Sequence, residues 1–420
     1  MRIIPRSVLI ISAIVALSLL GDQMLYVVLP VAHKAVGVPV IYIGLLLSAN
    51  RLVRLLTNTF AGYIIKRFGR EWPFILALLL GALTTFAYGI AYGVWIFLII
   101  RLLWGMSWSF IRLEGLSAVL DVASKKTRGR YMGIFQAISR LGSTVALLAG
   151  GVLTDMIGFR STFLLFGGLT SFAPLLAYYE MSHRRNIGTT QSMKNTNILT
   201  APLVKNKDQK LQANIATTGR EWKVIWRMRV VNFGTFSTSF IGGLLFATLG
   251  YVLSSRFGST IVVSRLTIGI ASLTGFLLSS RGFLSLGFAP IAGYLADRWG
   301  RHKTLSCGMI ISSLAVVLLG LSLSLPVMIG IILLIFIIGI ALAVIFNAVA
   351  GDIAPPDKRT TYLSQFVTWQ DLGSAAGPLI GYWIVAHFDS FWLYFSGACI
   401  LLLASGLYTA TFMRDRVEQR

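Results

Sequence analysis

Two short stretches of the 420-residue chain decide its fold: GYIIKRFGR at 62–70 and GYLADRWGR at 293–301. The offset between them is 231 residues, and the same offset carries Asp121 onto Asp352. Matches that lie far apart in the chain and need no gaps indicate an internal repeat. The chain is therefore predicted to consist of two similar halves. Other pairs in this register are Ala123 with Ala354, Arg128 with Arg359, Tyr131 with Tyr362, Gly142 with Gly373 and Gly150 with Gly381.

The composition around these motifs is that of an integral membrane protein. Hydrophobic residues make up 56% of the chain, charged residues make up 12%, and the mean hydropathy is +0.77, whereas soluble domains have about 25% charged residues. A spanning helix needs about 20 apolar residues. We therefore predict an all-α membrane protein with 12 transmembrane helices, arranged as two six-helix pseudo-symmetric halves. The expected spans are 8–30, 40–64, 73–92, 95–121, 130–154, 160–179, 230–254, 265–292, 304–322, 326–351, 360–386 and 390–412.

One long polar stretch, residues 180–229, divides the spans into six and six. Its content of Ser, Thr, Asn, Gln and Lys predicts a cytoplasmic linker that is largely disordered. The chain is thus divided into an N-terminal half at 1–179, the linker at 180–229 and a C-terminal half at 230–420. The end of the linker, REWKVIWRMR at 220–229, mixes Trp and Ile with Lys and Arg. This mixture predicts a short helix on the inner membrane surface.

The net charge of +22 is distributed in a way that predicts the orientation of the chain. With the N-terminus inside, the inner segments hold 27 Lys and Arg residues and the outer loops hold four. Cytoplasmic loops of membrane proteins are enriched in these cations. We therefore expect a multi-pass protein of the cytoplasmic (inner) membrane with both termini in the cytoplasm. The cations would also attract anionic lipid, and no nucleic-acid partner is expected.

The repeated motif resembles the signature loop of the major facilitator superfamily, which follows the second helix of each half. The second copy, GYLADRWGRHK at 293–303, is the fuller one, and the first copy has Lys66 where the family has Asp. RLLWG at 101–105 resembles the helix-4 motif of the family, and GSAAGPLIG at 373–381 resembles its antiporter motif. In the fifth span, the matching glycines flank Ala146-Leu147 in place of Gly-Pro.

This resemblance implies a transporter of the 12-helix drug/proton antiporter-like branch, whose halves rock about a central cavity. The signature loops would act as conformational latches at the cytoplasmic face. We expect Arg70 to pair with Asp121, and Arg301 with Asp352, in the outward-open state, and we expect both pairs to break as the halves rock. The alternative is that these cations only anchor the topology. The predicted latch residues are Gly62, Arg67, Gly69, Arg70, Asp121, Gly293, Asp297, Arg298, Gly300, Arg301 and Asp352.

Nine ionisable side chains fall inside the expected spans, where charge is costly and usually functional. The six bases exceed the three acids by three, so the surplus is expected to face a wet cavity or an anionic ligand. Arg101, Trp108 and Arg112 follow the spacing of one helical stripe, although packing within the protein is the alternative for Trp108. The predicted substrate-binding residues are Arg51, Arg54, Arg101, Trp108, Arg112 and Arg281, and the other ionisable residues in the spans are Asp22, Glu114, Arg140 and Asp371.

Asp22 is the first candidate for proton coupling, because it is the only carboxylate in the first span and lies at about the depth of Arg51 and Arg101. The proton affinity of a carboxylate depends on water access and on nearby arginines, and rocking would change both. Glu114 and Asp371 are the other candidates. The structural alternatives are permanent ion pairs: Asp22 with Arg51, Asp371 with Arg54, and Glu114 with a nearby arginine.

These features predict a proton-coupled secondary active transporter that moves a small organic solute by alternating access. The surplus of arginines favours an organic anion, such as a carboxylate, a siderophore-like compound or a phosphorylated metabolite, because the guanidinium fork suits these groups. Asp22, Arg101 and the glycines of the fifth span favour the alternative, a multidrug/proton antiporter that exports lipophilic or cationic compounds.

Other classes of protein are disfavoured by what the sequence lacks. It has no GxxxxGK[ST] motif for an ATP-driven pump, and its intramembrane acids are scattered rather than paired as an enzyme would need. No cofactor and no metal site are expected, since the four histidines lie in or beside loops. The expected partners are the small-molecule substrate, protons and membrane lipids, and the chain is expected to act as a monomer.

Overall fold

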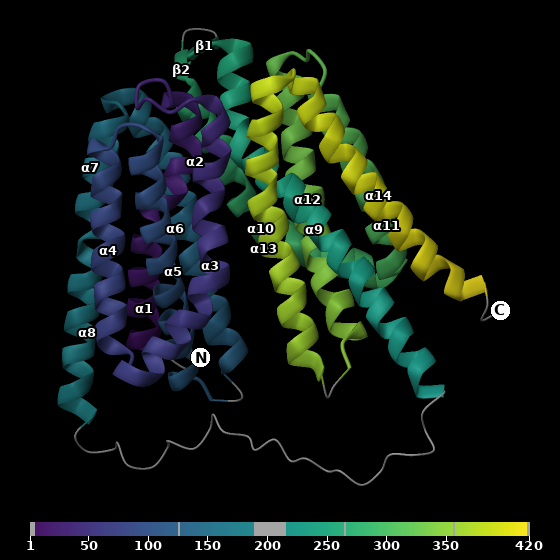
Figure 1. Ribbon diagram of the computed structural model, residues 1–420, viewed down its shortest axis with the longest axis horizontal. Coiled ribbons are helices and arrows are strands. Elements are labelled where there is room, and N and C mark those ends of the chain that lie inside the picture. Colours follow the sequence, from purple (N-terminus) through teal and green to yellow (C-terminus); the bar gives the residue numbers. More distant parts are fainter. Residues whose placement is uncertain (1–4, 125–126, 189–215, 264–265, 356–357, 418–420) are drawn as a thin grey trace.

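The computed structural model describes the chain except for residues 1–4, 125–126, 189–215, 264–265, 356–357 and 418–420. Two groups of long helices stand side by side and diverge toward the end of the molecule where both termini lie (Figure 1). The first group is α1 (Arg6–Ser18), α2 (Leu20–Ala32), α3 (Val40–Phe68), α4 (Glu71–Ile90), α5 (Val94–Val122), α6 (Arg128–Ile157), α7 (Phe159–Thr170) and α8 (Phe172–Gly188). The second is α9 (Ala216–Phe257), β1 (Thr260–Val263), β2 (Leu266–Gly269), α10 (Ile270–Trp299), α11 (Arg301–Leu319), α12 (Leu325–Ile353), α13 (Arg359–His387) and α14 (Ser390–Val417).

The repeat found in the sequence is visible in the helix bounds. α5 begins at Val94 and α12 at Leu325, and both helices end 231 residues apart as well, at Val122 and Ile353. The start of α6 at Arg128 and the start of α13 at Arg359 keep the same offset. Glycines at matching positions of the repeat also make matching helix contacts: those of α6 pack against α1 and α2, and those of α13 pack against α9. The two groups are therefore built on one helical plan.

The prediction of an all-α membrane protein is confirmed in its class. Within the described ranges, eleven spans are long and apolar enough to cross a membrane when α1 with α2, and α7 with α8, are each taken as one span. The expected span 360–386 forms α13, whose 29 residues are long enough to cross. α13 is too polar to be counted among the eleven, because it carries Gln370, Asp371 and Ser374, which line an internal cavity rather than facing lipid.

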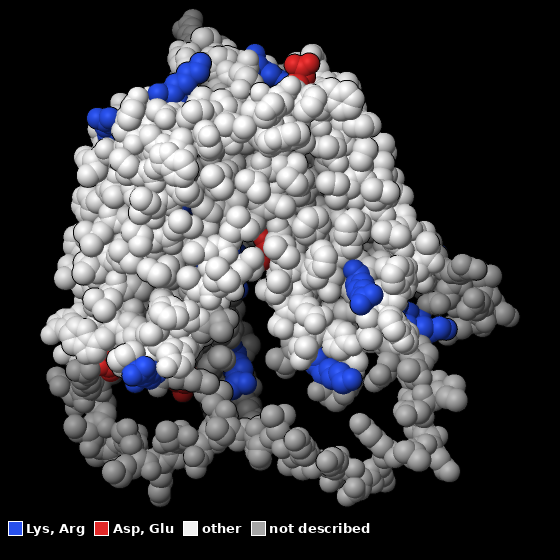
Figure 2. Space-filling model, viewed as in Figure 1, with Lys and Arg blue, Asp and Glu red and all other residues white. Residues whose placement is uncertain are grey.

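Large apolar side chains cover the outside of both helix groups. Leu56, Ile90 and Trp95 are each more than 70% exposed, an arrangement that would be unfavourable in water. In Figure 2 the charged side chains gather toward the two ends of the molecule and inside the hollow between the groups, leaving a broad uncharged belt. This surface suits a lipid bilayer.

Three local features differ from the expectations. Residues 260–263 and 266–269 form an antiparallel hairpin, so the helix expected from 265 begins only at Ile270. Gly258, at φ +83°, ends α9, and the β-branched residues that follow favour extended strands. The predicted start of the span at 265 is therefore wrong by five residues, while the all-α class holds.

The first span is divided at Leu19 into α1 and α2, with the chain still in a helical conformation there. The sixth span is divided at Ser171 into α7 and α8. The hydroxyl groups of Thr170 and Ser171 both donate to the Gly167 carbonyl, and such local bonds compete with the helical ladder.

The ends of the expected linker at 180–229 are helical. α8 continues to Gly188, and α9 is a single helix of 42 residues that begins at Ala216. The predicted surface helix at 220–229 is therefore the first part of α9 and not a separate element, because no turn interrupts the helical run. The remainder of the predicted linker, with its expected disorder, lies outside the described residues at 189–215.

The two groups touch through glycines. A Cβ at Gly151 of α6 would clash with the Ala271 carbonyl of α10, and a Cβ at Gly275 of α10 would clash with the Leu147 carbonyl of α6. Between α3 and α13, Gly44 packs in the same way against the Pro378 carbonyl. Small residues of this kind let membrane helices approach closely. The halves are therefore in direct backbone contact on the side of the β1–β2 hairpin.

We name the end that carries both chain termini the termini face and the end that carries the β1–β2 hairpin the hairpin face. At the hairpin face, Asp155 of α6 reaches the first turn of α10. Its Oδ2 atom accepts hydrogen bonds from the backbone N–H of Ser272 at 2.6 Å and from the Ser272 hydroxyl at 2.5 Å. The N-cap residue of α10, Gly269, has no side chain to do this. A carboxylate from one half thus caps a helix of the other, where a negative charge is favoured.

We predict that Asp155→Ala loosens the hairpin face. Loss of such a cap costs about 1 kcal/mol, which corresponds to about a fivefold change in an opening equilibrium. The measurement is the thiol-labelling rate of a cysteine placed at Val31, a partly buried residue beside Gly250, in a chain with Cys307 and Cys399 replaced by serine. The labelling rate should rise several-fold.

The matched control is Asp389→Ala, which removes another exposed carboxylate outside the α6–α10 contact. It should leave the labelling rate unchanged. Equal rates in the parent and in Asp155→Ala would show that the Asp155 cap does not hold the hairpin face closed.

Candidate functional site

Two adjoining pockets lie between the halves and together form the cavity. One has a volume of about 290 Å³ and the other about 300 Å³, and both are lined by Gln23 and Arg51. The first lies mainly against α9, α10, α12 and α13, and the second against α1, α2, α3, α5 and α6. Figure 2 shows the hollow between the halves opening toward the termini face, with charged side chains visible inside it.

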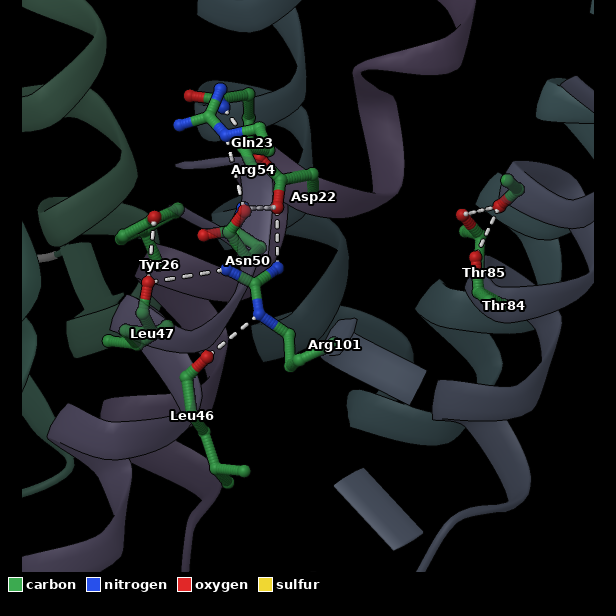
Figure 3. A network of polar contacts seen from close by, with 11 residues as sticks. Asp22, Gln23, Tyr26, Leu46, Leu47, Asn50, Arg54, Thr84, Thr85 and Arg101 are labelled. Carbon is green, nitrogen blue, oxygen red and sulfur yellow. Dashed lines mark hydrogen bonds and ion pairs between the residues drawn. The ribbon is translucent and has the colours of Figure 1, made fainter. Parts of the chain in front are cut away.

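A buried ion pair lies beside the cavity in the N-terminal half. Arg101 Nη1 lies 2.5 Å from Asp22 Oδ1, and Asn50 Nδ2 donates to the same oxygen at 2.9 Å. The second carboxylate oxygen accepts from Gln23 Nε2 at 2.8 Å. Arg101 Nε donates to the Leu46 carbonyl at 2.9 Å. Figure 3 shows Asp22 at the centre of this network, where α2, α3 and α5 meet.

Close helix packing makes the network possible. A Cβ at Gly105 of α5 would clash with the backbone of Asn50 on α3, so glycine at this position allows α5 to lie against α3. One turn before Gly105, Arg101 then reaches both the Asp22 carboxylate and the backbone carbonyl of Leu46 on α3. The Tyr26 hydroxyl donates to the Leu47 carbonyl in the same layer.

The prediction that Arg101 contacts substrate needs correction for this conformation. Its side chain is 0% exposed, and it is not among the residues that line the two pockets. The physical reason is that its donors are directed at Asp22, Leu46 and Leu47. Arg101, and not the expected Arg51, is therefore the ion-pair partner of Asp22. Asp22 itself lines the cavity.

The other predicted residues of the N-terminal half do line the cavity. The guanidinium of Arg51 lies 5.9 Å from the centre of the Tyr26 ring, and Arg54 Nε donates to the Asn50 carbonyl at 3.1 Å. The rings of Trp104 and Trp108 are stacked, with centroids 5.6 Å apart. The pocket residues include Arg51, Arg54, Trp104, Trp108, Arg112 and Arg140.

The C-terminal half contributes Arg281 and Asp371 to the cavity, together with the hydroxyl groups of Thr235 and Thr238. Among the residues that the structure describes, Asp371 makes no ion pair, so the expected pair with Arg54 is not formed. Both Arg51 and Arg54 are nevertheless near enough to feel the attraction of this carboxylate. The cavity therefore carries a surplus of positive charge.

Glu114 lies elsewhere. It is 6% exposed and is not among the lining residues of either pocket. Of the three predicted proton-coupling residues, Asp22 and Asp371 thus reach the cavity and Glu114 does not in this conformation.

Sequence reasoning missed Gln23, which donates a hydrogen bond to Asp22, and Tyr26, which donates to the Leu47 carbonyl beside it. Gln23 is the next residue in the chain, and Tyr26 follows Asp22 by four positions, on the same helical face. Both are polar residues in an apolar span, and this signal could have identified them.

The predicted latch pairs are present. Arg70 Nη1 lies 2.6 Å from Asp121 Oδ2, while Arg301 pairs with both Asp352 and Asp297. Each pair lies within one half, between a loop and the end of α5 or α12, and each is formed while the cavity opens at the termini face (Figures 1 and 2). The pairs were expected in the outward-open state, and the structure has both of them in a conformation whose cavity opens at the termini face.

The signature glycines divide into two kinds. Gly69 and Gly300, at φ +82° and +93°, end α3 and α10, in a left-handed conformation that side chains disfavour. A Cβ at Gly62 or Gly293 would meet nothing within 4 Å, so these two glycines make no close helix contact here. The remaining latch residues, Arg67 and Arg298, are exposed.

Comparison with known proteins places these features in a family. The family model described as Major Facilitator Superfamily matches residues 11–281 and 232–420. Multidrug resistance protein MdtG of Enterobacter lignolyticus is 24% identical over 88% of this chain and 82% of its own length. The PmrA homolog of Lactococcus lactis, a multi-drug resistance efflux pump, is 21% identical over 90% of this chain and 87% of its own length.

An uncharacterized MFS-type transporter of Methanocaldococcus jannaschii is 24% identical over a shorter region, which covers 42% of this chain and 46% of that protein. Among solved structures, a bacterial homolog of the human lysosomal transporter Spinster, in an inward-facing and occupied conformation, has a TM-score of 0.74 at 15% identity and covers 97% of both chains. The nucleoside transporter NupG has a TM-score of 0.71 at 11% identity, over 97% of this chain and 100% of NupG.

The likeness to solved structures shows the fold, and the family model covers nearly the whole chain. The repeat, the paired helix groups and the cavity between them agree with that match. This chain belongs to the major facilitator superfamily and is a multi-pass membrane transporter, not an enzyme.

Proposed function

We propose that the protein is a proton-coupled exporter of small amphipathic compounds, of the multidrug efflux type, that works by alternating access. The observation that carries the proposal is Asp22, a carboxylate that borders the cavity and is ion-paired to a buried arginine. The names of the relatives that match over most of their length, which are multidrug resistance proteins, support export of this kind. The aromatic pair of Trp104 and Trp108 offers an apolar surface for such compounds.

The proposed conformation is inward-open. The cavity opens toward the termini face (Figure 2), and glycine contacts bring the halves together on the hairpin side. The excess of Lys and Arg in the segments at the termini face supports its assignment to the cytoplasm. Substrate would then enter from the cytoplasm. We place the protein in the inner membrane, as a monomer.

Proton coupling follows from the Asp22–Arg101 pair. Protonation would neutralise the Asp22 carboxylate and remove its charge attraction to Arg101. By linkage, protonation shifts the protein toward any state in which Asp22 and Arg101 are apart. A proton taken up from outside and released inside would thereby drive the cycle, and a cationic compound near Asp22 would compete with it, giving antiport.

Transport of an organic anion is the second candidate, and one observation favours it. Five arginines line the cavity. The carboxylate of Asp371 also lines it, but in the described structure this carboxylate forms no ion pair with any of them. Guanidinium groups suit carboxylates and phosphates. The relatives' names support the multidrug function more directly. A measurement of which substrate charge is transported distinguishes the two candidates. The five residues are Arg51, Arg54, Arg112, Arg140 and Arg281.

We predict that Asp22→Asn separates proton coupling from transport. Asparagine keeps the size of the side chain and cannot carry a titratable proton. In proteoliposomes, accumulation of rhodamine 6G driven by a pH gradient should fall at least tenfold, while exchange of the dye without a gradient continues. Exchange and gradient-driven accumulation are measured in the same vesicle preparation.

Asp389→Asn, at an exposed carboxylate outside the cavity, is the matched control and should behave as the parent protein does. If Asp22→Asn still accumulates the dye in response to the gradient, Asp22 is not the coupling site. Coupling would then pass to Asp371 or Glu114.

We further propose that the latch pairs hold the signature loops rigid, so that each half moves as one body. Arg301 binds acids on α10 and on α12, and so joins three helices. Asp352→Asn should therefore speed hydrogen exchange in residues 297–303 a few-fold, because these exposed pairs are individually weak. Unchanged exchange in this segment would leave Arg301 and Asp352 without a role in ordering the loop. Asp389→Asn again serves as the control.

A further inference from the structure

Three arginines from different helices lie together where the halves meet. Gly282 of α10 packs directly against Thr144 of α6, since a Cβ at Gly282 would clash with the Thr144 hydroxyl. That hydroxyl donates to the carbonyl of Arg140, one turn away on α6. Arg281, next to Gly282, is therefore held close to Arg140 across the junction. Arg51 of α3 lines both pockets and completes the group.

The charges of the three arginines are not balanced by the protein. Arg281 and Arg51 line one pocket, and Arg51 and Arg140 line the adjoining one, so their like charges repel one another. Within the described parts of the chain, Arg281 has no hydrogen bond and no ion pair. The neighbouring acid Asp22 is already paired with Arg101, and Asp371, which lines the same pocket as Arg51 and Arg281, forms no ion pair within the described residues. Like charges that stay together in a membrane protein need a counter-ion or water.

The surroundings of the arginines are built to receive an anion. The Arg281 guanidinium lies beside Gly242 of α9, with its nitrogen atoms 3.7 Å and 3.8 Å from the position that a Cβ would take there. Ser139, next to Arg140, has a buried hydroxyl oxygen that finds no hydrogen-bond partner among the described residues, and it lines the cavity. It can donate to an acceptor that enters beside the arginines. The unpartnered Ser139 hydroxyl and the Arg281 guanidinium, which has no ion pair among the described residues, thus both border the cavity.

We propose that Arg51, Arg140 and Arg281, with Ser139, form a binding subsite for the anionic group of an amphipathic substrate, a carboxylate or a sulfonate. The proposal rests on the proposed function and adds anionic amphipathic compounds to the cationic ones considered there. The planar guanidinium groups bind the two or three oxygens of such a group. The stacked rings of Trp104 and Trp108 border the same pocket and receive the apolar part.

The subsite also links binding to the movement of the halves. Arg51 and Arg140 belong to the N-terminal half and Arg281 to the C-terminal half, so a bound anion contacts both. Without it, the arginines repel one another across the junction. The anion replaces this repulsion with attraction, and it thereby favours the state in which the halves close around the substrate.

The test compares two probes that share one ring system and differ in charge. Dansylate (5-dimethylaminonaphthalene-1-sulfonate) is an anion, and dansylamide is its neutral sulfonamide. Binding of each to the purified full-length protein in neutral detergent is measured by energy transfer from tryptophan. We expect dansylate to bind the parent protein at least tenfold more tightly than dansylamide.

Arg281→Gln should reduce this preference about tenfold, and Arg281→Lys should retain part of it. Arg140→Gln should act in the same direction and serves as a second variant should Arg281→Gln fold poorly. The matched control is Arg160→Gln, which removes an exposed arginine on α7 outside the cavity. It should leave both affinities unchanged.

Equal affinity of the parent protein for the two probes would overturn the proposal. A preference for dansylate that survives both Arg281→Gln and Arg140→Gln would overturn it as well. No pH gradient is used in this assay, so its result is independent of proton coupling. Loss of the preference with intact gradient-driven rhodamine transport would reject the subsite alone, whereas an arginine-dependent preference without gradient-driven transport would reject the proposed function alone.

Discussion

The ion pair between Asp22 and Arg101 is the interaction on which the rest of the site depends. A single buried charge is very costly in a bilayer, and breaking such a pair by removing one partner leaves the other uncompensated. Here the pair is completed by Asn50, Gln23 and the backbone of α3, so that α2, α3 and α5 are tied together in one layer. Asp22, Gln23 and Asn50 of this layer line the cavity.

Because Arg101 is satisfied inside the protein, the positive surplus belongs to the cavity. The cavity in turn exists because the halves meet closely only at glycines, along α6–α10 and α3–α13 on the hairpin side. Because glycines have no side chains, few interlocking side chains must separate when the two halves move relative to each other. The charge surplus, the aromatic pair and the Asp22 carboxylate therefore lie around one space that both halves line, which is the arrangement expected of a transporter that exposes one site to either side in turn.

The sequence predicted more about the fold than about the site. An ungapped repeat and apolar length identified the halves and nearly all spans, because both signals depend only on composition along the chain. Depth along a helix correctly placed Asp22, Arg51 and Arg101 in one layer, but depth does not say which way a helix is rotated. The contact of Gly105 with Asn50 decides that rotation and buries Arg101. The hairpin at 260–269 and the continuation of α9 to Ala216 were missed for another reason: both depend on tertiary packing at the ends of spans, where apolar patterning is weak.

We propose that a proton on Asp22 separates it from Arg101 and so moves the halves. The most direct measurement is the distance between spin labels at Val122 on α5 and Thr361 on α13, exposed positions at the termini face, in a chain with Cys307 and Cys399 replaced by serine. Distances are recorded by pulsed electron resonance in nanodiscs as the pH is lowered. The account predicts that the distance shortens at low pH in the parent protein and does not respond to pH in Asp22→Asn. The same pH response in both proteins would contradict it.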